Sequence, residues 1–224
     1  MTWGMQISVM FVEKYAKHYS DFNQGKPYQD EVAWVYEWAR QPRSILDIGC
    51  GHADYWKFYP GHVYLRGIER SKDMIAASGK EDMIFNIDVL KEPIPRGKKY
   101  ALATALFDVL NYMPSLNWLN DLPIKRGGHL IFDIWSLWKA KKDGFKRTFR
   151  RVDKMSRVIY PIKSQGKAID LRVMLFGPGF FETEVHKMYV HSFEDVKRQT
   201  REAYDIKQVV YTESWQTWYK LRKK

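Results

Sequence analysis

The sequence predicts an α/β fold with a doubly wound, mostly parallel, seven-stranded sheet and a small antiparallel insert after the fifth strand. Three observations support this. Short apolar runs alternate with helix-compatible segments between residues 44 and 134, a glycine pair follows the first run, and strand-like runs separated by turn signals follow residue 134. Such alternation indicates parallel strands joined by right-handed crossovers. A chain of 224 residues fits one domain with a sizeable core.

Five apolar runs are predicted to form the parallel strands, at residues 44–48, 63–68, 83–87, 100–106 and 129–134. Helices are predicted at residues 54–59, 72–78 and 114–122, and Gly127 and Gly128 are predicted to turn the chain into the fifth strand. Ligands of such sheets bind beyond the carboxyl ends of the strands. Residues 44–134 are therefore the predicted ligand-binding core.

The first strand ends in a glycine turn, Asp47-Ile48-Gly49-Cys50-Gly51. Glycines allow a positive φ and a close approach of the backbone to a ligand, and the following helix start offers unpaired N–H groups. The dinucleotide-binding fingerprint is incomplete, because Asp54 stands where its third glycine would be. The turn predicts a nucleotide-type site of another kind.

Polar side chains stand at the ends of the later strands. Glu69 follows Asp47 by 22 residues, the offset at which an acidic residue meets ribose hydroxyls in nucleotide-binding α/β domains. Asp88 follows 19 residues later and is a candidate acceptor for an adenine amino group, while Asp108 and Asn111 follow the fourth strand. We expect these groups to converge at one edge of the sheet.

The N-terminal segment, residues 1–40, is predicted to be a helical lid. Residues 5–20 and 28–40 have helix-like apolar spacing, and the turn between them contains Pro27. Tyr15, Tyr19 and Tyr28 are candidate hydroxyl donors to a ligand, although packing alone also explains tyrosines at such positions.

The C-terminal part is predicted to hold the antiparallel insert, residues 145–190, and a closing unit, residues 192–224. The insert strands are expected at residues 157–162, 168–176 and 181–190. Ser192 and Asp195 have the spacing of a helix cap, predicting a helix to about residue 203. Strands at residues 206–212 and 215–221 then close the sheet.

The stretch Leu46-Asp47-Ile48-Gly49-Cys50-Gly51 resembles the first motif of class I S-adenosylmethionine-dependent methyltransferases. The resemblance covers about residues 44–134 and implies a Rossmann-like methyltransferase fold with S-adenosylmethionine as cofactor. By this resemblance Glu69 holds the ribose, Asp88 holds the adenine, and residues 105–112 lie beside the sulfonium and the acceptor. The full candidate cofactor-binding set is Asp47, Gly49, Gly51, Glu69, Asp88, Val89, Leu106, Tyr19 and Tyr28.

The order of lid, glycine turn, insert and Glu-x-His before a helix looks like the glycine and amino-sugar N-methyltransferase group. Glu184, His186 and the turn at residues 191–193 carry this likeness, with residues 25–28 near the N-terminus. The Asn-Pro-Pro-Tyr type motif of DNA and protein-glutamine methyltransferases does not occur after the fourth strand, which counts against those subclasses.

His186 and Tyr112 are the candidate catalytic residues, with His186 as a base near the acceptor. The six histidines lack metal-ligand spacing, and one cysteine cannot build a thiolate site, so we expect no metal. Methyl transfer from a sulfonium needs mainly alignment of the reactants and exclusion of water. The scarcity of other acid–base residues is therefore compatible with this reaction.

The net charge of +11 lies entirely in the last part of the chain. Residues 1–138 hold 16 basic and 16 acidic residues, whereas residues 139–224 hold 21 and 10. This predicts either an anionic partner or a solvated basic face. Lys146, Arg147, Arg150, Arg151, Arg157 and Arg172 are the candidates to contact phosphate. The expected substrate is a small, phosphate-bearing amine metabolite such as a nucleotide-linked amino sugar.

Two alternatives stay open at this point: an RNA methyltransferase whose basic surface tracks phosphates, and a non-catalytic binding module that keeps the cofactor fold. The single Cys50 excludes an internal disulfide and suits a reducing cytoplasm. Apolar runs are all shorter than the roughly 18 residues that span a bilayer, and the N-terminus lacks a signal pattern. We therefore expect a cytoplasmic enzyme without a membrane partner.

Overall fold

The computed structural model describes residues 26–135, 148–152, 155–177, 179–212 and 216–224. Seven strands form one sheet in the order β10-β11-β5-β4-β1-β2-β3. The parallel strands are β1 (Ser44–Ile48), β2 (Tyr64–Glu69), β3 (Ile84–Asn86), β4 (Tyr100–Ala105) and β5 (Ile124–Trp135). β11 (Gln216–Lys223) pairs antiparallel with β5, and β10 (Tyr204–Tyr211) pairs antiparallel with β11. The predicted doubly wound, mostly parallel, seven-stranded sheet is confirmed.

β1 is an interior strand of the sheet, between β4 and β2, and all five of its residues are buried. Leu46 and Ile48 pack into one apolar core and Ile45 into another, because successive side chains point to opposite faces. A strand covered on both faces reads as a continuous apolar run. Because β1 is packed on both faces, the glycine turn that follows it is held in place.

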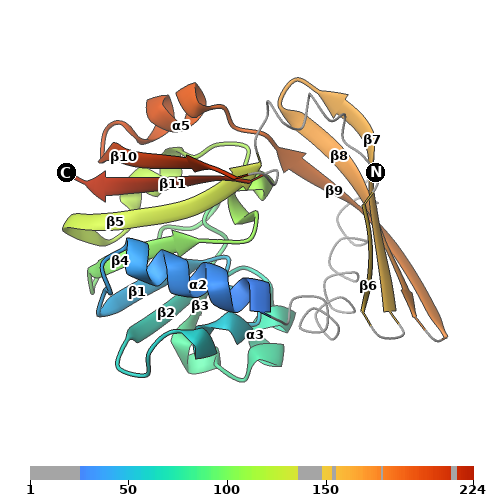
Figure 1. Ribbon diagram of the computed structural model, residues 1–224, viewed down its shortest axis with the longest axis horizontal. Helices are drawn as coiled ribbons and strands as arrows, with labels where there is room; N and C mark the ends of the chain where they lie inside the picture. The colour runs from blue at the N-terminus through green and yellow to red at the C-terminus, as the bar shows by residue number, and fades with distance from the viewer. Residues whose placement is uncertain (1–25, 136–147, 153–154, 178, 213–215) are drawn as a thin grey trace.

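Helices cover both faces of the sheet (Figure 1). α2 (Lys26–Trp38) lies across the face that Ile45 shares, with Val32 and Val35 fully buried. α5 (Phe193–Thr200) lies near β10, and Val196 joins the core of the other face. Ser192 and Asp195 form the predicted capping box. A third α-helix among the described residues is α3 (Lys72–Ser78), as predicted. The lid helix predicted at residues 5–20 lies outside the described residues.

Several crossover helices are shorter than predicted. The segments expected to be helical at residues 54–59 and 114–122 form 3-10 turns, η1 (Asp54–Phe58) and η4 (Asn117–Asp121). In η4 the amide of Asn120 donates to the carbonyl of Asn117, and the indole of Trp118 donates to Ser115 O. Such local side-chain bonds compete with a regular helix. Two further 3-10 turns are η2 (Glu81–Met83) and η3 (Val109–Tyr112).

The glycine pair at 127–128 does not precede β5, as the sequence indicated, but lies within it. β5 begins at Ile124, and its pairing with β4 shifts register between Tyr100 and Leu102. Gly127 has φ of 77°, which suits a bulge inside a strand. Gly127 and Gly128 therefore mark a bulge within β5 and not a turn before it.

The insert is a separate antiparallel sheet with the order β6-β7-β8-β9. Its strands are β6 (Thr148–Val152), β7 (Met155–Gln165), β8 (Ala168–Gly177) and β9 (Phe180–Tyr189). Three were predicted, and β6 was missed. The insert stands beside the edge at which β5 ends (Figure 1), where Ile169, Leu171 and Met188 pack near Trp135. The side chains on this face of the insert therefore look toward the carboxyl ends of the parallel strands.

Candidate active site

The glycine turn is anchored to the end of β2. The N–H groups of Gly49 and Cys50 both donate to Ile68 O, at 2.7 and 3.2 Å. Gly49 and Gly51 have φ of 65° and 55°, a backbone region that favours glycine. A Cβ on Gly49 would lie 2.6 Å from a methyl carbon of Val109, so the turn also packs directly against η3. The turn is thereby held between the ends of β2 and β4.

Glu69 lies beside this turn at the end of β2. Its carboxylate accepts hydrogen bonds from Gly51 N at 3.1 Å and from Ser71 N at 2.8 Å. A carboxylate has about four acceptor positions, and these bonds occupy two of them. The half-buried side chain therefore keeps acceptor capacity for two hydroxyl groups. This geometry fits the predicted contact with a ribose.

Asp47 lies beneath the turn rather than at its surface. Its buried carboxylate accepts hydrogen bonds from Thr104 Oγ1 at 2.8 Å, from the Trp56 indole at 2.6 Å and from the Tyr55 hydroxyl. Burial raises its pKa to about 6 against the lowering effect of these bonds, and the charge of Glu69 raises it further. Asp47 therefore joins β1, β4 and η1 under the glycine turn.

Asp88 and Val89 follow β3 in a tight turn. One carboxylate oxygen of Asp88 accepts from Leu90 N at 3.1 Å, and the other pairs with the Lys91 ammonium at 3.2 Å. Asn86 donates to the carbonyl oxygens of Glu69 and Arg70, which fixes this turn to the end of β2. Val89 packs against the core beside it.

The segment after β4 has an unusual backbone. Phe107 and Asp108 both have left-handed φ, 63° and 66°, although neither is glycine. Asp133, a buried residue of β5, accepts from Phe107 N at 2.8 Å and from Asp108 N at 3.1 Å. Charge-assisted bonds of this kind offset strain of about 1–3 kcal/mol per residue. The candidate Leu106 is 1% exposed, so it lies within the core just before this segment.

Three carboxyl groups gather at this segment. Burial raises the pKa of Asp133, and the neighbouring charges of Asp108 and Glu31 raise it further. Burial and Asp108 likewise raise the pKa of Glu31, on α2, to about 7. Sequence reasoning missed Asp133 and Glu31. A charged residue inside the apolar run Ile131-Phe132-Asp133-Ile134 was the available signal for Asp133.

The two candidate catalytic residues meet across the interface between the insert and the core. Tyr112 on η3 and His186 on β9 have ring centroids 5.8 Å apart in an edge-on arrangement. His186 Nε2 lies 3.2 Å from a carboxylate oxygen of Glu184, and both side chains are largely buried. Alternation along β9 puts Glu184 and His186 on one face, the face of Leu171 and Val173 that looks toward the core.

Asn111 connects the same two parts of the molecule. This fully buried side chain donates to Tyr189 O at 2.8 Å and accepts from Trp135 N at 3.1 Å. His191 adds a bond from its imidazole to Met113 O at 2.9 Å. η3 is therefore fixed to the end of β5 and to the end of β9.

Comparisons with solved structures show which proteins share this fold. An S-adenosylmethionine-dependent methyltransferase from Clostridium acetobutylicum superimposes with a TM-score of 0.72 at 17% identity, over 96% of this chain and 98% of that one. CalS10, an amino pentose methyltransferase from Micromonospora echinaspora, gives 0.73 at 16% identity, over 94% and 96%. The sugar N-methyltransferase KedS8 from Streptoalloteichus gives 0.71 at 15% identity, over 94% and 93%.

The chain has the Rossmann-like fold of S-adenosylmethionine-dependent methyltransferases. No protein-family model and no curated protein matches it by sequence. The likeness is therefore one of three-dimensional structure, at identities that leave the subgroup open.

Other sequence candidates are placed differently on this methyltransferase fold. Tyr19, Lys146 and Arg147 lie outside the described residues, and Tyr28 lies in the first turn of α2. Arg150 and Arg157 pair across β6 and β7. Arg172 is exposed on the opposite face of β8 from Leu171, over the ring of Tyr160 at 6.0 Å. The expectation that the insert's basic residues crown the carboxyl end of the sheet is therefore wrong for Arg172, because strand alternation turns it outward.

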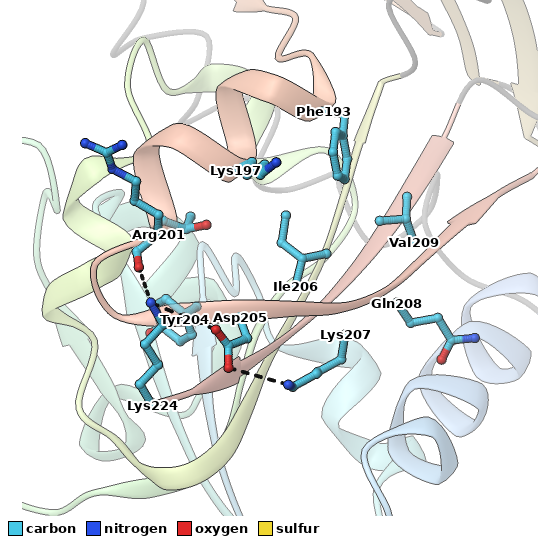
Figure 2. A pocket seen from close by; sticks show the side chains of 11 residues that line it. Phe193, Lys197, Arg201, Tyr204, Asp205, Ile206, Lys207, Gln208, Val209 and Lys224 are labelled. Carbon is cyan, nitrogen blue, oxygen red and sulfur yellow. Dashed lines mark hydrogen bonds and ion pairs between the residues drawn. The ribbon is translucent and has the colours of Figure 1, made fainter.

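An open groove of about 500 Å³ lies elsewhere on the methyltransferase fold, between α5 and β10 (Figure 2). Phe193, Ile206 and Val209 line it together with Lys197, Arg201, Lys207 and Lys224. It is remote from the glycine turn and Glu69. In the described part of the chain no three His, Cys, Asp or Glu side chains are arranged to hold a metal ion, and no described helix is both long and apolar enough to cross a bilayer.

Proposed function

We propose that the chain is an S-adenosylmethionine-dependent methyltransferase that acts on a small amine. The observation that carries the proposal is the pairing of Glu69 with the N–H of Gly51 at the carboxyl edge of the sheet. This pairing puts a carboxylate with free acceptor capacity beside a backbone turn of positive φ. A nucleoside with two ribose hydroxyls is the ligand that such a pair fits.

The proposed cofactor contacts follow from the positions of the strand ends. Glu69 would accept from the ribose hydroxyls, Gly49 and Gly51 would allow close approach of the backbone, and Asp88 would face the adenine. Asp47 and Asp133 would act from below by fixing the turns after β1 and β4. When bound, S-adenosylmethionine supplies an electrophilic methyl group on a sulfonium sulfur.

The residues opposite the cofactor suit an amine acceptor. An ammonium group must lose a proton before its nitrogen can attack, and a nearby imidazole can take that proton. His186 would be this base, Glu184 would stabilise the imidazolium that forms, and Tyr112 would lie beside the acceptor.

The similarity to an amino pentose methyltransferase and to a sugar N-methyltransferase supports an amino sugar as the acceptor class. The basic excess after residue 139 supports an acceptor whose other end is anionic, such as a sugar phosphate or a nucleotide-linked sugar. With Arg172 turned outward, the contacts to that end would come from other basic residues of the insert.

The test combines cofactor binding with transfer. Calorimetry should show binding of S-adenosylmethionine, and methyl transfer should be sought to pooled amino sugars, with and without phosphate, beside mixed-sequence RNA. RNA binding is measured from about 50 to about 300 mM salt, where a polyanion gives a log–log slope of about −0.7 per neutralised phosphate. Turnover of an amino sugar is expected. Steeply salt-dependent RNA methylation alone would favour the RNA enzyme, and binding without any transfer would favour the non-catalytic module.

A further inference from the structure

Four basic side chains gather at the amino-terminal edge of the seven-stranded sheet, opposite the edge that holds the glycine turn. They are Arg40, which follows α2, His129 on β5, and Lys220 and Arg222 on β11; we call them the β11 basic cluster. Arg222 pairs directly with His129 across the two strands. Lys220 lies two residues before Arg222, on the same face of β11. This is the face that packs on α2, since Trp218 contacts Trp34.

Lys220 is already balanced by the end of α2. Its ammonium donates to the carbonyl oxygen of Trp38 and lies 5.6 Å from the ring centroid of that residue. The carboxyl end of a helix carries a partial negative charge that favours a cation. Lys220 therefore caps the helix, whereas the guanidinium groups of the cluster require another explanation.

Arg40 and Arg222 are exposed, and neither takes part in an ion pair between described residues. The guanidinium of Arg222 lies over the β5 bulge, with one nitrogen 3.6 Å from the position that a Cβ on Gly127 would take. Its direction is therefore set by the glycine bulge and by its pairing with His129.

The charges of the cluster act on each other. Burial first, and then the charges of Lys220, Arg222 and Arg40, together lower the pKa of His129 to about 4. Burial and Arg40 also lower the pKa of Lys220. Converging positive charges destabilise the folded chain unless an anion lies among them.

The backbone that carries Arg40 is strained. Arg40 and Gln41 have left-handed φ of 62° and 51°, in a position where helices commonly end in glycine. The amide of Gln41 donates to both carboxylate oxygens of Glu37 at 3.1 Å, which engages the acidic side chain one turn away. A non-glycine residue here is costly for the fold alone, and it places a guanidinium group beside the cluster.

We infer that the β11 basic cluster is a binding site for a phosphate group. Arg40 and Arg222 hold the group, and His129 lies beside Arg222 on β5. Guanidinium groups match the oxygens of phosphate in paired hydrogen bonds, and the ring N–H of a half-buried imidazole adds a donor. The phosphate can belong to a small ester or to an RNA strand, because the recognised chemistry is shared. The site lies at the opposite edge from the proposed methyl transfer and does not depend on it.

The test uses His129 as the reporter. Its imidazole proton resonance is followed against pH in sodium phosphate, in adenosine monophosphate and in sodium chloride of equal ionic strength. Phosphate and the nucleotide should raise the pKa of His129 by about one unit or more, because an adjacent anion favours the imidazolium, whereas chloride should not. Arg222→Ala should weaken phosphate binding about tenfold, as expected for a charged hydrogen-bond partner.

Lys197→Ala is the matched control. It removes a positive charge from the groove between α5 and β10 (Figure 2), on a helix that packs on the other face of the sheet from α2, and should leave phosphate binding unchanged. Without phosphate, Arg222→Ala should already raise the pKa of His129, which verifies their contact. A short single-stranded RNA that only Arg222→Ala weakens would assign the phosphate to a strand. The inference would be overturned if the pKa of His129 stayed unchanged at the highest phosphate concentration, or if both variants weakened phosphate binding equally.

Discussion

Asp133 accepts a 2.8 Å hydrogen bond from the backbone N–H of Phe107, a residue held in left-handed conformation. The second oxygen of the carboxylate accepts from the next N–H along the chain. Asp133→Ala should lower the free energy of unfolding by about 2–4 kcal/mol, because two buried N–H groups lose their acceptor. Asp133→Asn keeps one acceptor oxygen and should cost less. Urea unfolding measures both, and equal stability of Asp133→Ala and the wild type would contradict the role.

The packing of the glycine turn against η3 can be tested by a pair of substitutions. Gly49→Ala places a Cβ 2.6 Å from Val109 and strains a backbone with φ of 65°, so it should destabilise the protein by about 2 kcal/mol or more. Val109→Ala in the same chain removes the collision but leaves the strain. Urea unfolding of the double variant should therefore recover part of the loss and not all of it; full recovery would mean that the positive φ costs nothing.

Glu31 and Asp47 should stabilise the protein less as the pH rises through the range in which they titrate. The pKa of Glu31 is raised from 4.5 to about 7 and that of Asp47 from 3.8 to about 6, both first by burial. A raised folded pKa means that the folded state keeps protons which the unfolded chain has lost, so their stabilisation is present below about pH 4 and lost by about pH 7. His129, whose pKa is lowered to about 4, contributes in the opposite direction, so this decline is measured as the difference between the wild type and Glu31→Gln in unfolding at about pH 5 and about pH 8.

Glu31→Gln should make this decline shallower, and Asp108→Asn should shift it to lower pH, because Asp108 raises the pKa of Glu31. Asn tolerates the left-handed φ at position 108, so the second variant changes charge with little change of backbone. A decline in Glu31→Gln as steep as in the wild type would assign it to other groups.

Cofactor affinity should depend on the charge of Glu69. Glu69→Ala should weaken S-adenosylmethionine binding about ten- to hundredfold, and Glu69→Gln should weaken it less because one acceptor oxygen remains. Gly51→Val should abolish binding in a folded protein, since φ of 55° and the space beside the ligand both require glycine. Calorimetry decides, and Lys125→Ala, an exposed residue near the start of β5, serves as the control. Affinity unchanged in both Glu69 variants would make Glu69 only an anchor for the turn.

Proton transfer should depend on His186 and on its partner Glu184. His186→Ala should lower kcat about hundredfold on an amine acceptor near neutral pH while leaving cofactor affinity unchanged, because a positioned base contributes about that much. Glu184→Gln should lower kcat less than His186→Ala, because it keeps the imidazole and removes only the carboxylate that lies 3.2 Å from it. Tyr112→Phe keeps the ring contact and should be mild. A kcat unchanged in Glu184→Gln would reduce Glu184 to packing.

The parts of the fold that followed from sequence were those fixed by local pattern. The apolar run before Gly49, the spacing to Glu69 and the cap at Ser192 each depend on a few neighbouring residues. The bulge at Gly127 escaped because it is defined by the pairing of β5 with β4. β6 forms a hairpin with the next strand, β7, and escaped because its sequence Thr-Phe-Arg-Arg-Val lacks a clear apolar alternation. Asp133 and Glu31 gain their character only when β5 and α2 bring them beside Asp108. The outward direction of Arg172 depends on strand register, which net charge does not contain.

The single amide of Asn111 has a mechanical consequence. Its oxygen accepts from the N–H of Trp135, the last residue of β5, and its nitrogen donates to the carbonyl of Tyr189, the last residue of β9. The side chain therefore links the two sheets. Tyr112 is the next residue along the chain and is therefore held by the same link. We therefore expect a displacement of the four-stranded sheet at Tyr189 to reach Tyr112 directly through η3.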